Sequence, residues 1–329
     1  MFVGAAPGVP REEVLEGVRV VRRGGAVLTR VHAALFARRR SAGFDVIVEE
    51  INTLPYWARL WSRVPVMLCI HQIAGEVWDW EAPRGVGRIG RASEPFLLSC
   101  ARSSAIVLSD STKHDLMRFG YAPAQILVIA PGLSIAPRAA AAEQERNYKR
   151  VAYVGRLAPS KRVDHAIKAI AELARSGTEM HLDIVGRGPV AVKESLKREA
   201  SRLGITGQVV FHDFLEAEAR DVVLGRAAAV VMTSVREGWG MSVTEAGALG
   251  TPSVVYRCPG LVDSTIDGVT GIVVDPTPRA LAQGIGLLTG DHALWSRLSE
   301  GARIRTRELT WERTSTEFEA ALQSRVDAV

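Results

Sequence analysis

Short apolar, β-branched runs alternate along the whole chain with longer segments of helical period. Such alternation is typical of βαβ units that build parallel sheets. The runs that predict strands form two groups: 18–21, 45–49, 66–70, 105–108 and 125–129 in the first half, then 150–154, 181–185, 208–211, 229–232, 253–256 and 271–274 in the second. We therefore expect an α/β fold made of two doubly wound, Rossmann-like domains.

A segment without periodicity separates the two groups of strands. Residues 135–148 contain Pro137, four consecutive alanines and a charged stretch. We interpret this segment as the linker between an N-terminal domain (1–140) and a C-terminal domain (141–329). Residues 163–173 and 310–324 each place apolar side chains on one helical face, and we expect the second helix to close the C-terminal domain. Two such domains leave a cleft at the carboxyl ends of their strands, where ligands bind in doubly wound sheets.

The most informative pattern follows the predicted strand 229–232 and reads REGWGMSVTEAG over residues 236–247. Gly238 and Gly240 let the backbone approach a ligand closely, and the helix that starts near Met241 offers free N–H groups to a phosphate. Glu245, about one turn inside this helix, is placed to reach a vicinal diol such as a ribose. Glu237 is placed to face the group beyond the phosphates. The segment predicts a site for a diphosphate and a diol but names no reaction.

A second strand-to-helix loop carries two cations. Arg156 and Lys161 lie in the segment VGRLAPSK, directly after the predicted strand 150–154. Cations at the carboxyl end of a strand and next to a helix N-terminus are suited to neutralise a diphosphate. The alternative is that both cations pair with surface carboxylates.

Four motifs in this order resemble retaining glycosyltransferases of family 4: GRL…K at 155–161, IVGRGP at 184–189, EGWG…EA at 237–246 and GTP at 250–252. Two glutamates separated by seven residues are a hallmark of that family. The first half is similar too, in the segments EIN at 50–52, IHQ at 70–72, LSDS at 108–111 and PG at 131–132. The resemblance covers essentially the whole chain and implies the GT-B fold, in which two Rossmann-like domains face each other across a cleft.

The resemblance also implies roles for individual residues. Arg156 and Lys161 would hold the donor's diphosphate, and Glu245 the ribose hydroxyls. Glu237 would contact the hydroxyls of the donor sugar, while His71 of the N-terminal domain would meet that sugar from the other side; these two are the expected catalytic residues. For His71 the alternative is a core histidine at the end of a buried strand. The other expected donor contacts are Gly155, Gly238, Gly240, Met241 and Gly260.

The start of the chain departs from the family pattern. Members usually open with a strand, a glycine-rich loop and a long helix, which shape the acceptor pocket. Residues 1–8 instead resemble the second strand and the loop after it. We expect this departure to reduce transfer activity rather than donor binding.

These features favour a glycosyltransferase that moves a sugar from a nucleotide-diphosphate sugar to an acceptor hydroxyl on a glycan, a lipid-linked compound or a small molecule. The chain contains no Asp-x-Asp pair, so we expect no metal and no other cofactor. The resemblance implies front-face attack by the acceptor. The alternatives are a nucleotide-sugar-binding pseudoenzyme or partner subunit with an incomplete acceptor site, and a different GT-B chemistry such as an epimerase or a phosphorylase. The spacing of the two glutamates argues against the last.

Composition and charge narrow the location and the partners. The three cysteines are scattered, which fits a reducing compartment. Residues 11–40 carry eight arginines and three glutamates, an excess equal to the net charge of the whole chain, +5. No nucleic-acid-binding signature accompanies these arginines, so we expect no nucleic-acid partner.

The arginine run fits an anionic surface or substrate, or simply a solvated arginine-rich surface. Trp57 and Trp61, four residues apart with Arg59 and Arg63 nearby, would share one face of a helix. That face predicts either peripheral membrane contact or ordinary packing on the sheet. We expect a cytoplasmic protein, for which peripheral contact with the inner face of the membrane is one of these two alternatives.

Overall fold

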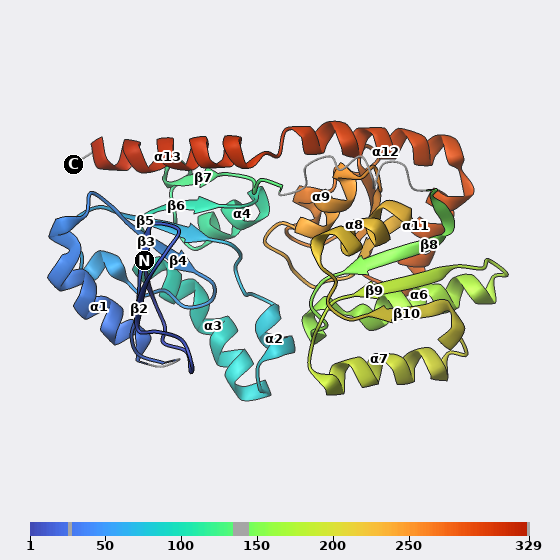
Figure 1. Cartoon of the computed structure of the whole chain (residues 1–329), viewed down its shortest axis with the longest axis horizontal. Helices are drawn as coiled ribbons and strands as arrows, with labels where there is room; N and C mark the ends of the chain where they lie inside the picture. Colours follow the sequence, from blue (N-terminus) through green and yellow to red (C-terminus); the bar gives the residue numbers. More distant parts are fainter. Residues whose placement is uncertain (26–27, 134–144, 328–329) are drawn as a thin grey trace.

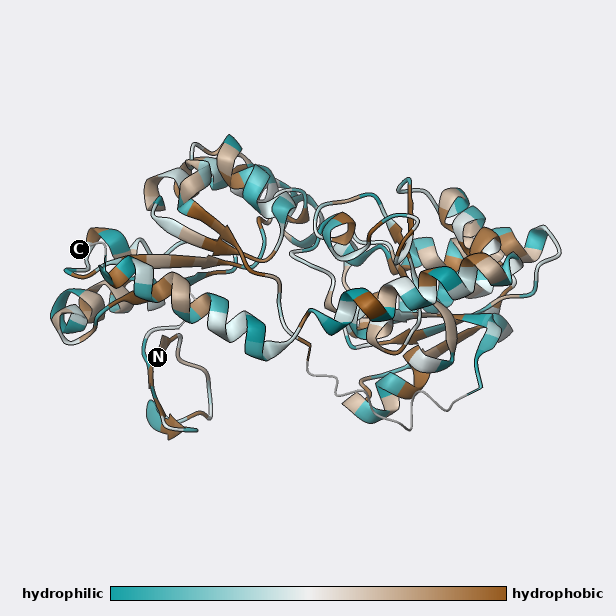
Figure 2. Ribbon diagram, turned by 90° about the horizontal axis from the view of Figure 1, so that it is seen from above, coloured by the Kyte–Doolittle hydropathy of each residue, from teal (hydrophilic) through white to brown (hydrophobic). Residues whose placement is uncertain are grey.

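The computed structural model describes residues 1–25, 28–133 and 145–327 and contains two α/β halves side by side (Figure 1). Parallel sheets with helices around them confirm the predicted fold class. Figure 2 shows the strands of both large sheets as mostly apolar ribbons inside helices of mixed polarity. The expected domain boundary between residues 140 and 141 lies outside the described residues.

The C-terminal half contains a six-stranded parallel sheet in the order β10-β9-β8-β11-β12-β13. The order reverses between β8 and β11, and this switch point is where doubly wound sheets bind ligands. β11 is buried along its whole length, as expected for a strand covered on both faces. The strands are β8 (Asn147–Val154), β9 (His181–Val185), β10 (Val209–His212), β11 (Ala227–Met232), β12 (Ser253–Tyr256) and β13 (Gly271–Val274).

Helices cover both faces of this sheet (Figure 1). The apolar face predicted for residues 163–173 is confirmed, because Val163, Ile167 and Ile170 of α6 are buried in the main core. The helices of this half are α6 (Val163–Arg175), α7 (Val190–Arg202), α8 (Ala217–Arg226), α9 (Met241–Ala248), α10 (Leu261–Ser264), α11 (Pro278–Gly290) and α12 (His292–Arg307).

The N-terminal half contains a four-stranded parallel sheet in the order β4-β5-β6-β7. Its core includes Leu68 and Ile70 of β5 and Val107 of β6, which are fully buried. The strands are β4 (Ile47–Ile51), β5 (Val66–Ile70), β6 (Ser104–Val107) and β7 (Ile126–Val128), and the helices are α1 (Thr29–Arg40), α2 (Val77–Glu81), α3 (Arg84–Ala101) and α4 (Asp110–Arg118).

The first three strands form a small separate sheet in the order β1-β3-β2. Residues 18–21 are a strand as predicted, but β3 (Val18–Arg22) pairs antiparallel with β2 (Glu12–Leu15) and parallel with β1 (Phe2–Val3). Glu16 and Gly17, which join β2 to β3, have positive φ angles of 48° and 83°. This two-residue hairpin turn keeps the two strands antiparallel, so β3 does not join the parallel sheet.

The predicted C-terminal helix exists as α13 (Trp311–Asp327), but it packs on the N-terminal half (Figure 1). Ala321, Phe318 and Leu322 contact a cluster that includes Met67 and Ile106 of the N-terminal sheet. The expectation that this helix closes the C-terminal domain was therefore wrong. The apolar side of α13 packs on apolar side chains of β5 and β6. Trp311, which was predicted to belong to that side, is instead 49% exposed.

Two further local predictions need correction. β8 begins at Asn147, so the end of the predicted linker is strand; residues 134–144 lie outside the described part. Trp57 and Trp61 do not share an α-helical face, because Trp57 has a left-handed φ of 54° and only the short 3₁₀ turn η2 (Ala58–Leu60) separates the two. Within the described residues, no helix is both long and apolar enough to cross a membrane.

Candidate active site

A cavity of about 630 Å³ lies between the two halves. Several of its lining residues directly follow strands of both sheets, which agrees with a cleft at the carboxyl ends of the strands. Asn52 and Thr53 follow β4, His71 and Gln72 follow β5, and Arg156 follows β8. Eight of the ten predicted site residues line it: His71, Gly155, Arg156, Lys161, Glu237, Gly238, Gly240 and Met241.

Two glycines let the loop before α9 approach the N-terminal half. A Cβ atom on Gly238 would lie 2.1 Å from the carbonyl oxygen of His71, so only glycine fits there. Gly240 has a φ of 109° and directly precedes α9, whose first residue is Met241. Ser242 Oγ ties the start of α9 to β8 by donating to the carbonyl oxygen of Val154 at 2.8 Å. The helix N-terminus with its free N–H groups therefore faces the cavity.

Lys161 and Glu237 form an ion pair at the cavity wall. The Nζ atom of Lys161 donates to Oε1 of Glu237 at 2.6 Å, and both side chains are mostly buried. Ser234 Oγ donates to the same carboxylate oxygen at 2.6 Å. Lys161, predicted to bind the phosphate, and Glu237, predicted to bind the sugar, are thus direct neighbours, although they are 76 residues apart in sequence.

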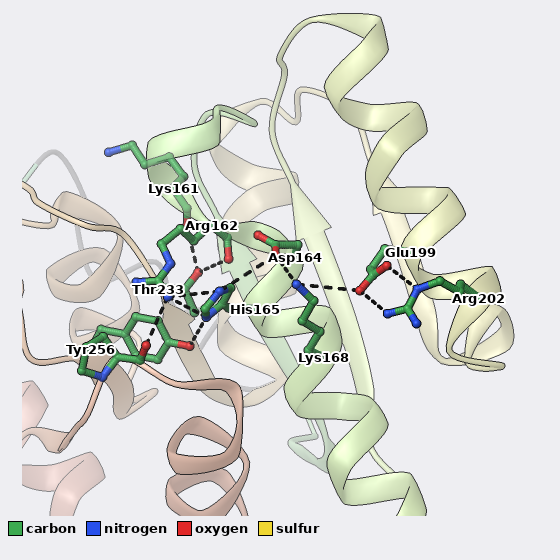
Figure 3. A network of polar contacts seen from close by, with 10 residues as sticks. Lys161, Arg162, Asp164, His165, Lys168, Glu199, Arg202, Thr233 and Tyr256 are labelled. Carbon is green, nitrogen blue, oxygen red and sulfur yellow. Dashed lines mark hydrogen bonds and ion pairs between the residues drawn. The ribbon is translucent and has the colours of Figure 1, made fainter. Parts of the chain in front are cut away.

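A polar network fixes the backbone that carries Lys161 (Figure 3). Thr233, the residue after β11, donates its hydroxyl to the carbonyl oxygens of Lys161 and Arg162, at 2.9 and 3.0 Å. Arg162 has a left-handed φ of 49° and contacts the ring of His165, whose Nδ1 lies 2.9 Å from the hydroxyl oxygen of Tyr256. Figure 3 shows the Lys161 side chain extending away from this network.

Arg156 has a partner from the other half of the molecule. Its Nη2 atom lies 3.3 Å from Oε1 of Glu81 in α2, and Ser160 Oγ donates to the same oxygen. The Arg156 side chain is still 67% exposed, so it keeps donors free for a ligand. Arg156 does pair with a carboxylate, as the alternative interpretation of the sequence proposed. Its partner Glu81 also lines the cavity, so the pair belongs to the site.

His71 is not a core histidine. It follows β5 directly, lines the cavity, and its side chain is 37% exposed. Its Nε2 atom lies 2.6 Å from Oε1 of Glu50. A carboxylate at this distance holds the imidazole ring in one orientation at the cavity.

The other two predicted residues lie behind the cavity wall. Glu245 is one turn deeper in α9 than the lining residues and pairs with Arg220 of α8 at 3.2 Å. Burial raises the pKa of its carboxyl group although Arg220 opposes this. Gly260 has a φ of 83°, and a Cβ atom there would lie 2.3 Å from the carbonyl oxygen of Glu237. Gly260 therefore supports the backbone of Glu237 rather than lining the cavity.

The sequence did not reveal a charged cluster that joins the two halves beside the cavity. Arg236 donates to Glu76 at 2.7 Å and to Asp115 at 2.6 Å, and its side chain is 8% exposed. Burial alone would lower the pKa of Arg236, but the two carboxylates raise it. The position of Arg236 directly before Glu237 could have drawn attention to it in the sequence. Its partners Glu76 and Asp115 could not have been found in this way, because no motif surrounds them.

The loop around Gly75 leaves room for the Arg236 side chain. Gly75 has a φ of 46°, and a Cβ atom there would lie 3.0 Å from Nε of Arg236. The buried carboxylate of Glu94 accepts the N–H groups of Ala74 and Gly75, both at 2.8 Å. Burial raises the pKa of Glu94, against the opposing effect of these N–H groups.

Comparison with known proteins gives consistent matches. The sequence profile of the family described as glycosyl transferases group 1 matches residues 138–305. A D-inositol 3-phosphate glycosyltransferase of Corynebacterium efficiens is 27% identical, over 97% of this chain and 78% of the relative. A glycogen synthase of Mycobacterium tuberculosis is 31% identical, over 77% of this chain and 61% of the relative.

Solved structures share the fold. Sucrose-phosphate synthase from Thermosynechococcus elongatus superposes with a TM-score of 0.81 at 21% identity, covering 100% of this chain and 89% of that one. HepE from Anabaena, solved in complex with UDP and glucose, gives a TM-score of 0.75 at 18% identity, covering 94% of this chain and 87% of that one.

Proposed function

This chain belongs to the glycosyl transferases group 1 family and is a glycosyltransferase, and from that premise we propose its reaction. The chain transfers a sugar from a nucleoside-diphosphate sugar to an acceptor hydroxyl, with retention of the anomeric configuration and without a metal ion. The observation that carries the proposal is the cavity in which Arg156, Lys161 and Glu237 of one half face His71 of the other.

The leaving diphosphate gains negative charge as the bond to the anomeric carbon breaks. Arg156, Lys161 and the N–H groups at the start of α9 are preorganised donors for that charge. A phosphate oxygen that binds Lys161 competes with Glu237 for its ammonium group. Donor binding therefore frees the Glu237 carboxylate to accept hydrogen bonds from the sugar hydroxyls.

Transfer on one face of the sugar accounts for retention. The acceptor oxygen forms its bond to the anomeric carbon on the face from which the diphosphate departs, and the acceptor proton passes to the leaving phosphate oxygen. His71 lies on the N-terminal side of the cavity, where it can donate a hydrogen bond to a sugar hydroxyl. The atoms balance without any further reactant.

Calorimetry can test whether protein cations, rather than a metal ion, bind the diphosphate. UDP, GDP and ADP are titrated with and without a chelator; we expect one of them to bind with an affinity that the chelator leaves unchanged. Arg156→Ala and Lys161→Ala should each weaken binding of that diphosphate by about 1.5–3 kcal/mol. They should weaken binding of the matching nucleoside, which has no phosphate, much less. Loss of binding on chelation would show that a metal carries the diphosphate. Retention is checked by NMR of the anomeric proton of the product.

A further inference from the structure

A second hollow lies on the N-terminal half, away from the cleft. It has a volume of about 470 Å³ and is lined by Leu35, Arg38 and Arg39 of α1 and by Arg63. In Figure 1, α1 lies at the end of the N-terminal half that faces away from the C-terminal half. A ligand in this hollow would leave the cleft open.

The structure joins two segments at this hollow that are separate in sequence. Arg38 and Arg39 end the arginine-rich stretch 11–40, and Arg63 follows η2. The two segments are fastened together because the backbone N–H of Arg63 donates to Ser41 Oγ at 3.2 Å. Neither segment forms the hollow alone.

The charge of the hollow lacks compensation. Among the described residues, no carboxylate pairs with the guanidinium groups of Arg38, Arg39 or Arg63, and none lines the hollow. The dipole of α1 favours arginines in its last turn, but this effect does not account for Arg63, which comes from another element. Three neighbouring cations repel one another, so an anion that binds between them lowers the electrostatic free energy.

Exposed apolar side chains occur in both segments that form the hollow. Leu35 lines it and is 46% exposed, while Leu60 and Trp61, three and two residues before Arg63, are 64% and 42% exposed. Arginines next to exposed tryptophan and leucine side chains are typical of surfaces that lie in the interface of a bilayer, where the cations meet phosphates and the apolar groups enter the acyl boundary.

From this combination we propose that the hollow binds the phosphate group of an anionic phospholipid and docks the N-terminal half on a membrane surface. The forked guanidinium groups suit phosphate oxygens, while Trp61 and Leu60 insert beside the head group. The proposal does not depend on the transfer reaction, because the hollow is separate from the cleft.

Sedimentation with vesicles tests the proposal on the full chain. We expect binding to vesicles of phosphatidylcholine with an equal amount of phosphatidylglycerol, little binding to phosphatidylcholine alone, and weaker binding as salt increases. The variant Arg38→Gln/Arg63→Gln should bind the anionic vesicles about 30-fold more weakly, at about 1 kcal/mol per arginine.

The matched control is Arg198→Gln/Arg297→Gln, which removes the same charge from exposed arginines of α7 and α12. It should bind the vesicles nearly as well as the wild type. Equal losses in both double variants would mean that only net charge matters and would overturn the proposed site. In the same way, Trp61→Ala should weaken binding more than Trp80→Ala, since Trp80 is equally exposed, at 45%, but belongs to α2 beside the cleft.

Two further measurements separate the remaining outcomes. If glycerol 3-phosphate in solution binds in an Arg38- and Arg63-dependent way while the anionic vesicles do not bind, the ligand is a soluble phosphate and the membrane proposal is wrong. Thermal unfolding and nucleoside-diphosphate binding are measured for every variant. Loss of vesicle binding with both retained supports the hollow, whereas absence of diphosphate binding in the wild type would count against the proposed reaction alone.

Discussion

The cations expected to bind the diphosphate already have carboxylate partners in the cleft. Lys161 pairs with Glu237 and Arg156 with Glu81. A buried cation is costly without a counter-charge, so Glu237 stabilises Lys161 in the ligand-free cleft, whereas the pair of the exposed Arg156 contributes little. A diphosphate that binds Lys161 must compete with Glu237, while Arg156 has donors to spare.

Glu245 gives a test at the scale of one residue. If its carboxylate binds both ribose hydroxyls, Glu245→Ala should weaken nucleotide binding by about 1.5–3 kcal/mol. The 2′,3′-dideoxy nucleotide, which lacks those hydroxyls, should bind the wild type and the variant equally in calorimetry. Unequal affinities for this analogue would instead assign Glu245 to structural support through Arg220, its ion-pair partner.

His165, which contacts the loop that carries Lys161, should make the stability of the protein depend on pH. Burial, and then the neighbouring Arg162, lower the pKa of His165 from 6.5 to about 4. The unfolded chain therefore binds more protons than the folded one in this range, and stability falls as the pH drops from 6.5 towards 4. His165→Gln should reduce this pH dependence of the free energy of unfolding, while the same change at the exposed His114 should not. Identical pH profiles for His165→Gln and the wild type would contradict this assignment.

At the scale of elements, α13 decides how the C-terminus is used. α12 belongs to the C-terminal half, yet α13 lies across the N-terminal sheet (Figure 1). An isolated bridge between Leu133 and Thr310, and the hydroxyl of Thr314 donating to the carbonyl oxygen of Ala130 at 2.9 Å, hold the chain at this crossing. The helix thus covers apolar surface of β5 and β6 that would otherwise face water.

Two neighbouring alanines test this packing. Ala321 is 6% exposed against the N-terminal sheet, whereas Ala320 is exposed. Ala321→Asp should destabilise the N-terminal half by about 2–4 kcal/mol, because it places an unpaired charge in an apolar contact. Ala320→Asp should change stability very little. Chemical unfolding of both variants measures the difference, and similar midpoints would show that α13 does not pack as described.

At the scale of the whole molecule, the two halves are joined by charged contacts beside the cavity. Arg236 of the C-terminal half reaches Glu76 and Asp115 of the N-terminal half. A third contact joins the backbone N–H of Ser111 to Asp263 at 2.9 Å. Since Arg236 directly precedes Glu237, the contacts that hold the halves together also position a predicted catalytic residue.

Arg236→Gln should therefore lower kcat with a smaller effect on donor affinity, and should widen the distribution of sizes in small-angle scattering as the halves separate. A double-mutant cycle with Asp115→Asn should give a coupling of about 1–3 kcal/mol. The control is Arg257→Gln, because Arg257 is exposed and its ion pair with Asp275 is long, at 3.9 Å. No coupling, or equal effects of both arginine variants, would mean that Arg236 does not position the halves.

The sequence by itself determined the strands of the two parallel sheets, the helices over residues 163–173 and 310–324, and the places where ligand-binding loops follow strands. The predicted strand 229–232 and the pattern around Glu237 were both correctly located, because apolar periodicity and glycine at a strand end are local properties of the chain. Gly17 also indicates the turn between β2 and β3, although it does not reveal that these strands form a separate sheet.

Only the tertiary structure decided which charges meet and which half each element covers. Arg156 meets Glu81 across 75 residues and Arg236 meets Asp115 across 121. α13 packs on the half that precedes it in sequence, and Arg63 joins Arg38 at one hollow. Such partners depend on how the two sheets are placed against each other, and no local period of the sequence encodes that placement.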